Sequence, residues 1–393
     1  MSIKQVEVGA ERYVACTPGQ FDQKNEMFKR PVWDPALKSL FQKFYMNECE
    51  PRDTPGYQHH EMACANASWY LDSLATRNLY KEHAGLYAWD WDGKFNFPRM
   101  RSGLKASMDD PAAVTHAVKK TAGLFGACLT GICKLDRRWL YSSGYFVTRE
   151  GGKPVEIDIP DNMTHVIVVA VPMDYESMRT SPTAPASAAT GAGYSRMAFT
   201  AGLLGQYIRG LGYTALACGN DTGCSIPMAI DAGLGELARN GLLITPQYGP
   251  RVRLAKIITD LPLIVDTPIE FGVWEFCKVC KKCAAECPSK AIPESDTTTD
   301  THNISNRTGL NRWPVNAEKC LSFWAANKTD CSNCIRSCPF NKPAGFLHDA
   351  VRCGISRMPW LNRLFLWGDD LCGYGRQLPA DKFWQQHEST EIS

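Results

Sequence analysis

The sequence has no long hydrophobic segment and no excess of charge of either sign. Its longest apolar run extends from Val166 to Met173, far short of the roughly 20 residues that a membrane-spanning helix needs. The 43 Lys and Arg residues nearly balance the 41 Asp and Glu residues, for a formal net charge of +2. This balance predicts no nucleic-acid partner bound through charge. The first residues, MSIKQVEVGAERY, show neither a basic segment followed by an apolar stretch nor a twin-arginine pair, so no export signal is recognisable.

Cysteine is abundant instead, and its distribution is uneven. The chain of 393 residues holds 17 cysteines, and eight of them lie between Cys277 and Cys338. An odd number of cysteines gathered late in a large chain is unlike the disulfide framework of a small secreted protein. The block therefore favours metal ligation. The length predicts two or three domains, and a composition with 44% hydrophobic residues argues against disorder.

The cysteine block has the spacing of the bacterial ferredoxin motif. It contains one complete C-x2-C-x2-C-x3-C-P run and a second, partial run with an additional cysteine upstream. In such motifs a tight loop supplies three thiolates to one 4Fe–4S cluster, and the cysteine before the proline ligates the other cluster. We therefore predict two 4Fe–4S clusters. The predicted ligands are Cys277, Cys280, Cys283 and Cys338 for the first cluster, and Cys320, Cys331, Cys334 and Cys287 for the second.

Zinc ribbons and structural disulfides are the alternative uses of these cysteines. Zinc sites favour two separated cysteine pairs over a continuous run, so the iron–sulfur interpretation is preferred. Three lysines lie among the predicted ligands: Lys278, Lys281 and Lys282. They could raise the potential of a cluster or dock an electron donor, although a solvated surface is the plainer interpretation.

Helix and strand patterns alternate upstream of the cysteines. A β-branched run at 165–171 is typical of a buried central strand. Helices are predicted at 36–45, 67–79, 112–135, 194–211 and 227–240, and strands at 214–218 and 252–259. A polar, hairpin-like stretch extends to about residue 163, and a proline-marked loop covers 179–185. The alternation indicates a mixed α/β sandwich between about 164 and 271.

Changes of pattern along the chain define four predicted regions. They are an N-terminal region (1–86), an α/β core (87–271) with an insertion at about 112–163, a cysteine-rich domain (272–342) and a closing segment (343–393). Trp and Phe are crowded at 86–101, which predicts the wall of a core or of an apolar pocket. Neither G-x-G pair, at 191–193 and 233–235, has the third glycine of a dinucleotide fingerprint.

Several of these motifs together resemble those of the reductive dehalogenases, the corrinoid and iron–sulfur enzymes of organohalide respiration. The resemblance extends from about residue 160 to the C-terminus and looks nearest to the chloroalkane-reducing members. It is carried by GYSRMAF (193–199), the stretch 218–253 from CGNDTGC to YGPRVR, the two ferredoxin motifs and SCPFNKP (337–343). It implies an α+β fold, in which a nitroreductase-like mixed α/β sandwich binds cobalamin or a related corrinoid in the base-off form. A two-cluster bacterial ferredoxin-like module would follow.

The resemblance also implies three catalytic positions: Tyr194, Asn220 and Arg253. A tyrosine stays protonated at neutral pH and can donate a proton, and a neighbouring guanidinium can stabilise the phenolate left behind. The asparagine could orient the hydroxyl or interact with the departing halide. The plainer alternatives are a buried tyrosine bonded to a backbone carbonyl and an Asn-Asp turn.

Other positions are weaker candidates for cofactor and substrate contacts. Gly233 and Gly241 could let the backbone approach the corrin, or could simply end helices. Phe44, Trp89 and Trp324 are candidates for an apolar substrate pocket, or for core packing. None of the eight histidines lies in the D-x-H-x-x-G pattern that other corrinoid enzymes use to ligate cobalt, which favours a cobalt without a protein ligand.

The resemblance implies a small organohalide substrate, such as a chlorinated alkane or alkene, and no nucleic acid. It also implies a membrane-anchor subunit, a quinone-linked electron donor and a possible homodimer. The expected location is the outer face of the cytoplasmic membrane, as a peripheral protein exported in the folded state, with the cytoplasm as the alternative.

Two competing functions remain open at this point. An epoxyqueuosine reductase-like enzyme acting on tRNA would be expected to carry an aspartate where Tyr194 stands, and a basic helical C-terminal region. The tail from Asp349 is instead rich in Trp and roughly neutral. A ferredoxin-type electron carrier with a structural α/β domain would have no corrinoid and no pocket.

Overall fold

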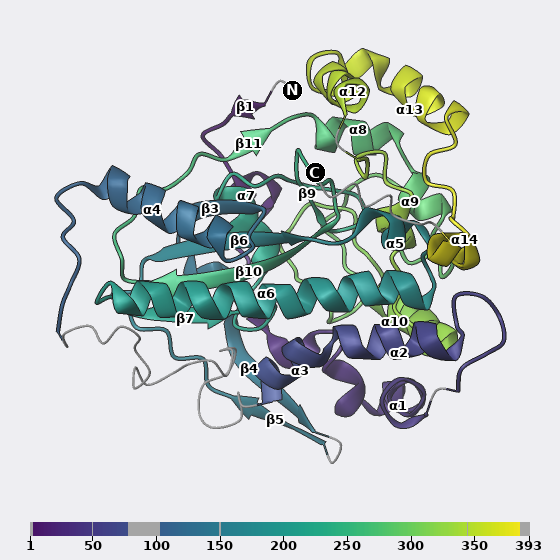
Figure 1. The fold of residues 1–393 in the computed structure, drawn as a ribbon, viewed down its shortest axis with the longest axis horizontal. Helices are drawn as coiled ribbons and strands as arrows, with labels where there is room; N and C mark the ends of the chain where they lie inside the picture. The colour runs from purple at the N-terminus through teal and green to yellow at the C-terminus, as the bar shows by residue number, and fades with distance from the viewer. Residues whose placement is uncertain (1–2, 49, 78–102, 149–150, 344, 386–393) are drawn as a thin grey trace.

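An antiparallel four-stranded sheet forms the centre of the molecule (Figure 1). The computed structural model describes residues 3–48, 50–77, 103–148, 151–343 and 345–385. The strand order is β3-β6-β10-β7, and the register places Ile257 of β10 opposite Ile167 of β6 and Ala217 of β7. The four strands are β3 (Leu129–Lys134), β6 (His165–Pro172), β10 (Val252–Thr259) and β7 (Ala215–Cys218).

Strand β6 contributes side chains to two hydrophobic cores, one on each face of the sheet. Successive side chains of a strand point to opposite faces, so Val166 and Ile167 enter different cores. One core packs against α7 (Ser225–Asp231), and the other packs against α6 (Ala184–Gly210). Both faces of β6 are covered, which confirms the buried central strand predicted at 165–171.

Helix α6 lies along one face of the sheet and is the longest helix among the described residues (Figure 1). Helix α4 (Pro111–Leu124) joins the same core, and α2 (His59–Ser68) and α3 (Tyr70–Arg77) pack against α6. Helix α6 begins ten residues before the predicted start at Tyr194. Its first turn contains Pro185, and proline is well tolerated there because its missing N–H would have no partner in the helix.

Two of the helix predictions were too long. The stretch 112–135 divides into α4 and strand β3, and the stretch 227–240 ends as a helix at Asp231. Gly233 adopts a left-handed conformation (φ 71°) that stops α7, and a short hairpin follows. The hairpin consists of β8 (Glu236–Leu237) and β9 (Leu243–Ile244).

Two further pairings involve the N-terminal segment. Strands β4 (Tyr141–Thr148) and β5 (Gly151–Val155) form the predicted hairpin, and β2 (Phe21–Asp22) adds to it in parallel. Strand β1 (Lys4–Gln5) pairs with β11 (Ile269–Glu270). Near the hairpin, α1 (Lys38–Phe41) continues into a single π-helical turn at Gln42–Met46.

Short helices hold the cysteine-rich region, and longer ones close the chain. The cysteine region contains α8 (Val273–Val279), α9 (Lys282–Ala285), α10 (Ala317–Asn327) and α11 (Asn333–Arg336). The closing segment contains α12 (Phe346–Arg357), α13 (Asn362–Leu371) and α14 (Ala380–Gln385).

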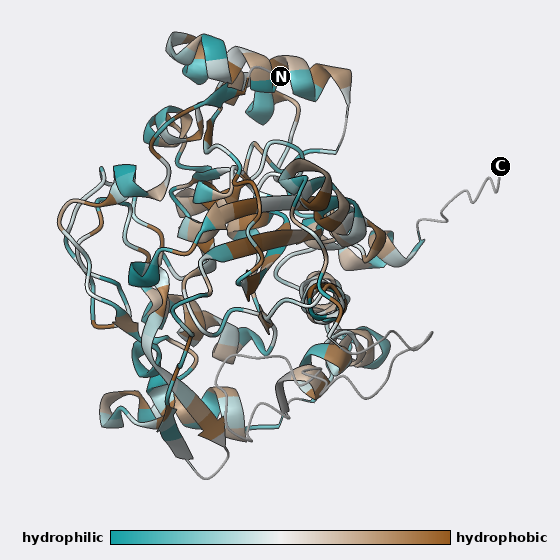
Figure 2. Cartoon of the chain, turned by 90° about the vertical axis from the view of Figure 1, so that its left-hand side faces the viewer, coloured by the Kyte–Doolittle hydropathy of each residue, from teal (hydrophilic) through white to brown (hydrophobic). Residues whose placement is uncertain are grey.

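Hydropathy divides these parts clearly (Figure 2). The central strands are strongly apolar, whereas α12 and α13 mix polar and apolar residues at the edge of the molecule. Exposed apolar side chains of the α12–α13 segment are Phe346, Leu347, Met358, Trp360, Leu364, Trp367 and Leu371. None of the helices in the described ranges is sufficiently long and apolar to cross a bilayer.

Candidate active site and cluster pockets

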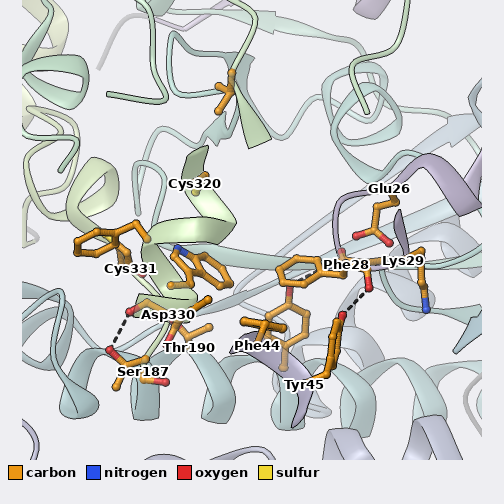
Figure 3. A pocket seen from close by; sticks show the side chains of 18 of the residues that line it. Glu26, Phe28, Lys29, Phe44, Tyr45, Ser187, Thr190, Cys320, Asp330 and Cys331 are labelled. Carbon is orange, nitrogen blue, oxygen red and sulfur yellow. Dashed lines mark hydrogen bonds between the residues drawn. The ribbon is translucent and has the colours of Figure 1, made fainter. Parts of the chain in front are cut away.

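A cavity of about 1170 Å³ lies where the sheet, the N-terminal segment and the cysteine-rich region meet. Figure 3 shows Thr190 and Ser187 of α6 on one side of it, Cys320 and Cys331 on another, and aromatic side chains of the N-terminal segment on a third. The cavity is larger than the roughly 300–1,000 Å³ of ordinary small-molecule sites. A plain electron carrier was expected to have no such pocket, so the geometry argues against that alternative.

The structure brings Tyr194, Asn220 and Arg253 together at the cavity wall. Asn220 Nδ2 donates a hydrogen bond of 2.7 Å to the Tyr194 hydroxyl. The Arg253 guanidinium carbon lies 4.7 Å from the centre of the tyrosine ring. Trp69 also stacks on Tyr194, with 4.9 Å between ring centres and 27° between planes. Three residues far apart in the sequence therefore surround one phenol.

The surroundings of Tyr194 keep its hydroxyl protonated. Burial raises the pKa of Tyr194 above its ordinary value of 10.0. The guanidinium of Arg253 and the hydrogen bond from Asn220 oppose this rise, and the carboxylates of Asp72 and Glu26 reinforce it. Arg253 Nε is buried and has no hydrogen-bond partner among the described residues. The site can therefore release a proton from the phenol while a nearby cation stabilises the resulting anion.

Two half-buried carboxylates at the cavity were not predicted from the sequence. Burial raises the pKa of Asp221 to about 7 and that of Asp72 to about 6. Asp221 follows Asn220 on the loop after β7, and its Oδ1 is buried without a partner among the described residues. The C-N-D-like motif could have suggested Asp221, whereas Asp72 becomes a candidate only through its tertiary position.

Lys256 fixes the loop that carries Asn220 through hydrogen bonds. This lysine is fully buried, and its ammonium donates to the carbonyl oxygens of Gly219 and Gly223 and to Ser225 Oγ. Burial lowers the pKa of Lys256. Arg253 packs on the α6 face of β10, and Lys256 reaches the loop from the opposite face of the same strand.

Aromatic residues form another part of the cavity wall, and Figure 3 shows Phe28, Phe44 and Tyr45 among them. Phe44 lies in the π-helical turn after α1, and Trp324 lies in α10. Phe28 bridges the two, with ring centres 6.1 Å from Phe44 and 5.6 Å from Trp324. Both predicted pocket residues thus line the cavity. Trp89, the third, lies outside the described residues.

The two predicted glycine contacts differ from the other site residues. Gly233 does not line the cavity: it ends α7, and a Cβ there would lie 2.5 Å from the carbonyl oxygen of Thr267. Its left-handed backbone and close packing explain the glycine without a cofactor contact, and its predicted role in cofactor binding stays a prediction. Gly241 lies in the β8–β9 turn, between the cavity residues Asn240 and Leu242, and is not itself part of the lining.

The eight motif cysteines gather in the two predicted sets. The first set, Cys277, Cys280, Cys283 and Cys338, surrounds a small, separate pocket that Phe276, Phe340 and Arg239 close. All four are at most 9% exposed. We name these four residues the first thiol group. Burial raises the pKa of each of these thiols, to about 11 for Cys280 and about 12 for Cys338.

The second set borders the large cavity instead. Cys287, Cys320, Cys331 and Cys334 all line it, and we name them the second thiol group. Burial acts to raise the pKa of Cys287, but hydrogen bonds from Ser289 and the Ala291 N–H outweigh it and lower the pKa. No described group of three or more His, Cys, Asp or Glu side chains is close enough to hold a single metal ion.

The residues present fit both iron clusters and a large amide-bearing cofactor. Each thiol group presents four cysteines around a pocket, the ligand set of a 4Fe–4S cluster. Buried polar atoms without partners in the described structure line the large cavity, and they include donors and acceptors: Asp221 Oδ1, Arg253 Nε, Trp324 Nε1 and Asp330 Oδ1. A buried polar atom without a hydrogen-bond partner destabilises the folded protein unless a ligand supplies that partner. A corrin ring carries amide groups, which both donate and accept hydrogen bonds.

The fold and the two thiol groups define a two-cluster iron–sulfur protein with a substrate-sized cavity beside one cluster site. Comparisons with known proteins agree. Residues 142–263 match the family model of a reductive dehalogenase subunit, and residues 276–341 match that of a 4Fe–4S double cluster binding domain. The chain thus resembles the reductive dehalogenases in the domain at 142–263 and in the double-cluster domain that follows it.

The chain is similar to two tetrachloroethene reductive dehalogenases. It is 39% identical over 298 residues to the protein of Sulfurospirillum multivorans, covering 70% of this chain and 60% of that protein. It is 37% identical over 338 residues to one of Desulfitobacterium hafniense, covering 76% of this chain and 60% of that protein. The chain therefore spans about 60% of the length of these curated relatives.

Solved structures share the fold. One described as a reductive dehalogenase, with a mechanism for B12-dependent dehalogenation, matches with a TM-score of 0.74 at 23% identity, covering 97% of this chain and 50% of that chain. A catabolic reductive dehalogenase in complex with 3-bromo-4-hydroxybenzoic acid matches with a TM-score of 0.72 at 22% identity, covering 98% of this chain and 50% of that chain. The mixed α/β architecture with a ferredoxin-like module is thus that of reductive dehalogenase structures.

Proposed function

We propose that this chain is a corrinoid-dependent reductive dehalogenase that removes halogen from a small chlorinated alkane or alkene. The observation that carries the proposal is that Tyr194, Asn220 and Arg253 face the same cavity as the second thiol group. A proton donor and a cluster site then flank one space. The names of the tetrachloroethene-reducing relatives support a chlorinated ethene in particular.

Both cofactors have matching residues in the chain. The two thiol groups would each hold one 4Fe–4S cluster, with the second group facing the cavity. Cobalamin or a related corrinoid in the base-off form would lie in the large cavity of a nitroreductase-like core. When bound, it supplies the low-valent cobalt at which a carbon–halogen bond can be broken.

The residues around the cavity divide the remaining work. Tyr194 donates the proton from its hydroxyl to the carbon that loses halogen, and Arg253 stabilises the phenolate. Asn220 fixes the direction of the hydroxyl through its 2.7 Å hydrogen bond. The aromatic wall of Phe28, Phe44 and Trp324 excludes water and suits an apolar substrate.

The partners and location are part of the same proposal. We infer a peripheral protein at the outer face of the cytoplasmic membrane, attached through a membrane-anchor subunit and supplied by a quinone-linked donor, with a homodimer as a further possibility for its assembly. The exposed apolar side chains of α12 and α13 support the existence of a protein partner, because contiguous exposed apolar surface commonly marks an interaction site. Cell fractionation with and without the anchor subunit would test the location.

Anaerobic reconstitution tests the enzyme. We expect about eight iron atoms per chain, four for each cluster, and one bound corrinoid seen by cobalt analysis and visible spectroscopy. With a reduced viologen as donor, the loaded protein should release halide from chlorinated ethenes or alkanes. Protein that holds iron but binds no corrinoid would contradict the proposal. Protein that binds both but releases no halide from any member of the panel would contradict the substrate class.

A further inference from the structure

Arg239 is a buried cation beside the first thiol group. It lies in the turn between β8 and β9, is fully buried, and closes the pocket that Cys277 and the other three thiols surround. Its Nε and Nη2 donate to the carbonyl oxygen of Cys277, at 3.1 and 2.9 Å. Its Nη1 donates to the carbonyl oxygens of Pro293 and Ser295, both at 2.8 Å. The guanidinium carbon also lies 4.7 Å from the centre of the Trp313 ring.

All the hydrogen-bond acceptors of Arg239 are neutral. Three lysines near the same thiols differ, because each of them has a carboxylate partner, whereas a fourth, Lys281, is exposed. Lys278 pairs with Glu275 at 2.6 Å, and Lys342 pairs with Asp369 at 2.6 Å. Lys282 contacts Asp369 and also Asp370, at 2.7 Å. The two lysines of the motif that the structure pairs in this way, Lys278 and Lys282, are therefore partly neutralised, whereas Arg239 keeps its full charge in the interior.

An uncompensated interior charge has a direct consequence for an iron–sulfur cluster. A cubane with four thiolate ligands is anionic, and each electron that it accepts adds negative charge. Cluster potentials depend on net charge, hydrogen bonding and solvent exposure. A guanidinium remains charged at any relevant pH, and its interaction with the cluster is poorly screened because both are buried.

We propose that Arg239 raises the reduction potential of the cluster held by the first thiol group and so sets it apart from the cluster at the cavity. Near the second thiol group, the buried Arg336 pairs with Glu286 at 2.9 Å and lacks this uncompensated charge. The inference rests on the two clusters of the proposed function, but on neither the corrinoid nor the organohalide. It assigns to Arg239 the role that the sequence suggested for the neighbouring lysines.

The test is a potentiometric titration of the full chain, reconstituted with iron and sulfide without air and followed by electron paramagnetic resonance. In Arg239→Gln, one of the two midpoint potentials should become more negative while the other stays unchanged. The matched control is Lys278→Gln, which removes the same charge next to Cys277 from a side chain that is 48% exposed. Solvent screens that charge, so the control should shift either midpoint far less.

Each outcome decides the inference. Unchanged midpoints in Arg239→Gln at full iron content would overturn it, as would an equal shift in the Lys278→Gln control. If Arg239→Gln fails to hold iron, Arg239→Lys decides, because it keeps the charge but not the fork of hydrogen bonds. A wild-type midpoint in that variant supports the electrostatic role, and a fall in its midpoint rejects it. Wild-type protein without two clusters would reject the proposed function as well.

Discussion

The two thiol groups come from nearly repeated sequence motifs but have opposite surroundings. The first group is sealed by Phe276, Phe340 and Arg239, whereas the second forms part of the wall of a large cavity. A sealed cluster exchanges only electrons with its surroundings. A cluster at the cavity can pass electrons to whatever occupies that space. The difference teaches that ligand spacing defines a cluster, while the residues around the ligands define its task.

Removing the proton donor should have the largest effect, because it stops the chemistry in the cavity and leaves both thiol groups unchanged. Tyr194→Phe keeps the ring against Trp69 and Arg253 but loses the hydroxyl that Asn220 contacts. We expect turnover to fall by about 10²- to 10⁴-fold, with iron and corrinoid contents unchanged. Tyr207→Phe, on the same helix but outside the cavity lining, should retain activity. Near-normal halide release by Tyr194→Phe would show that the cavity does not use this phenol.

Loosening the loop under the cavity should have the next largest effect. Lys256→Met leaves the carbonyls of Gly219 and Gly223 without their ammonium donor. Because Asn220 then loses its fixed position, we expect turnover to fall about 10- to 100-fold while both clusters persist. Steady-state kinetics of Lys256→Met, Asn220→Ala and the double variant would measure the coupling. Strictly additive effects would show that Lys256 does not act through Asn220.

The smallest expected effect concerns stability and pH on the cavity side. The pKa of Asp221 is raised by burial to about 7 in the folded protein, against an ordinary value of 3.8. The folded state therefore binds this proton more tightly, so its contribution to stability is complete below about pH 4 and is lost as the pH rises through 7. Lys256, Lys29 and Asp72 also act on this carboxyl.

Unfolding temperatures at pH 5 and pH 8 would measure this contribution. Between pH 5 and pH 8, the free energy of unfolding of wild type should fall by about 1 to 3 kcal/mol relative to that of Asp221→Asn, because the amide never has to lose a proton. The exposed Asp158→Asn serves as the control and should show no such trend. An identical pH dependence in wild type and Asp221→Asn would mean that this carboxylate is better solvated than its position indicates.

The sequence predicted the cysteine sets and the central strand because each depends on a local pattern, whereas Tyr194, Asn220 and Arg253 were implied by the resemblance to the reductive dehalogenases. Spacing defines the thiol groups, and the run at 165–171 defines β6. The C-N-D-like and Y-G-P-R-V-R segments contain Asn220 and Arg253. Prediction failed at 227–240, where helical composition continued past the turn at Gly233 that ends α7.

The roles of charged residues that depend on tertiary packing could not be predicted from local patterns. Arg239 lies in a stretch that reads as the end of a helix, and nothing local indicates that its partners are carbonyls rather than carboxylates. Asp72 reaches the cavity only because α3 packs against α6. Lys256 gave one signal, since it interrupts an otherwise apolar strand, but its target loop is 33 to 37 residues away in the sequence.

Arg253 and Lys256 lie three positions apart in strand β10. Arg253 contacts the ring of Tyr194 on one face of the strand, and Lys256, on the other face, holds the loop whose Asn220 donates to the Tyr194 hydroxyl. An odd spacing along a pleated strand puts two side chains on different faces. Inserting or deleting one residue between them would turn both cations to the same face. One would then be buried among aliphatic side chains, so evolution can lengthen the loops around this strand more readily than the strand itself.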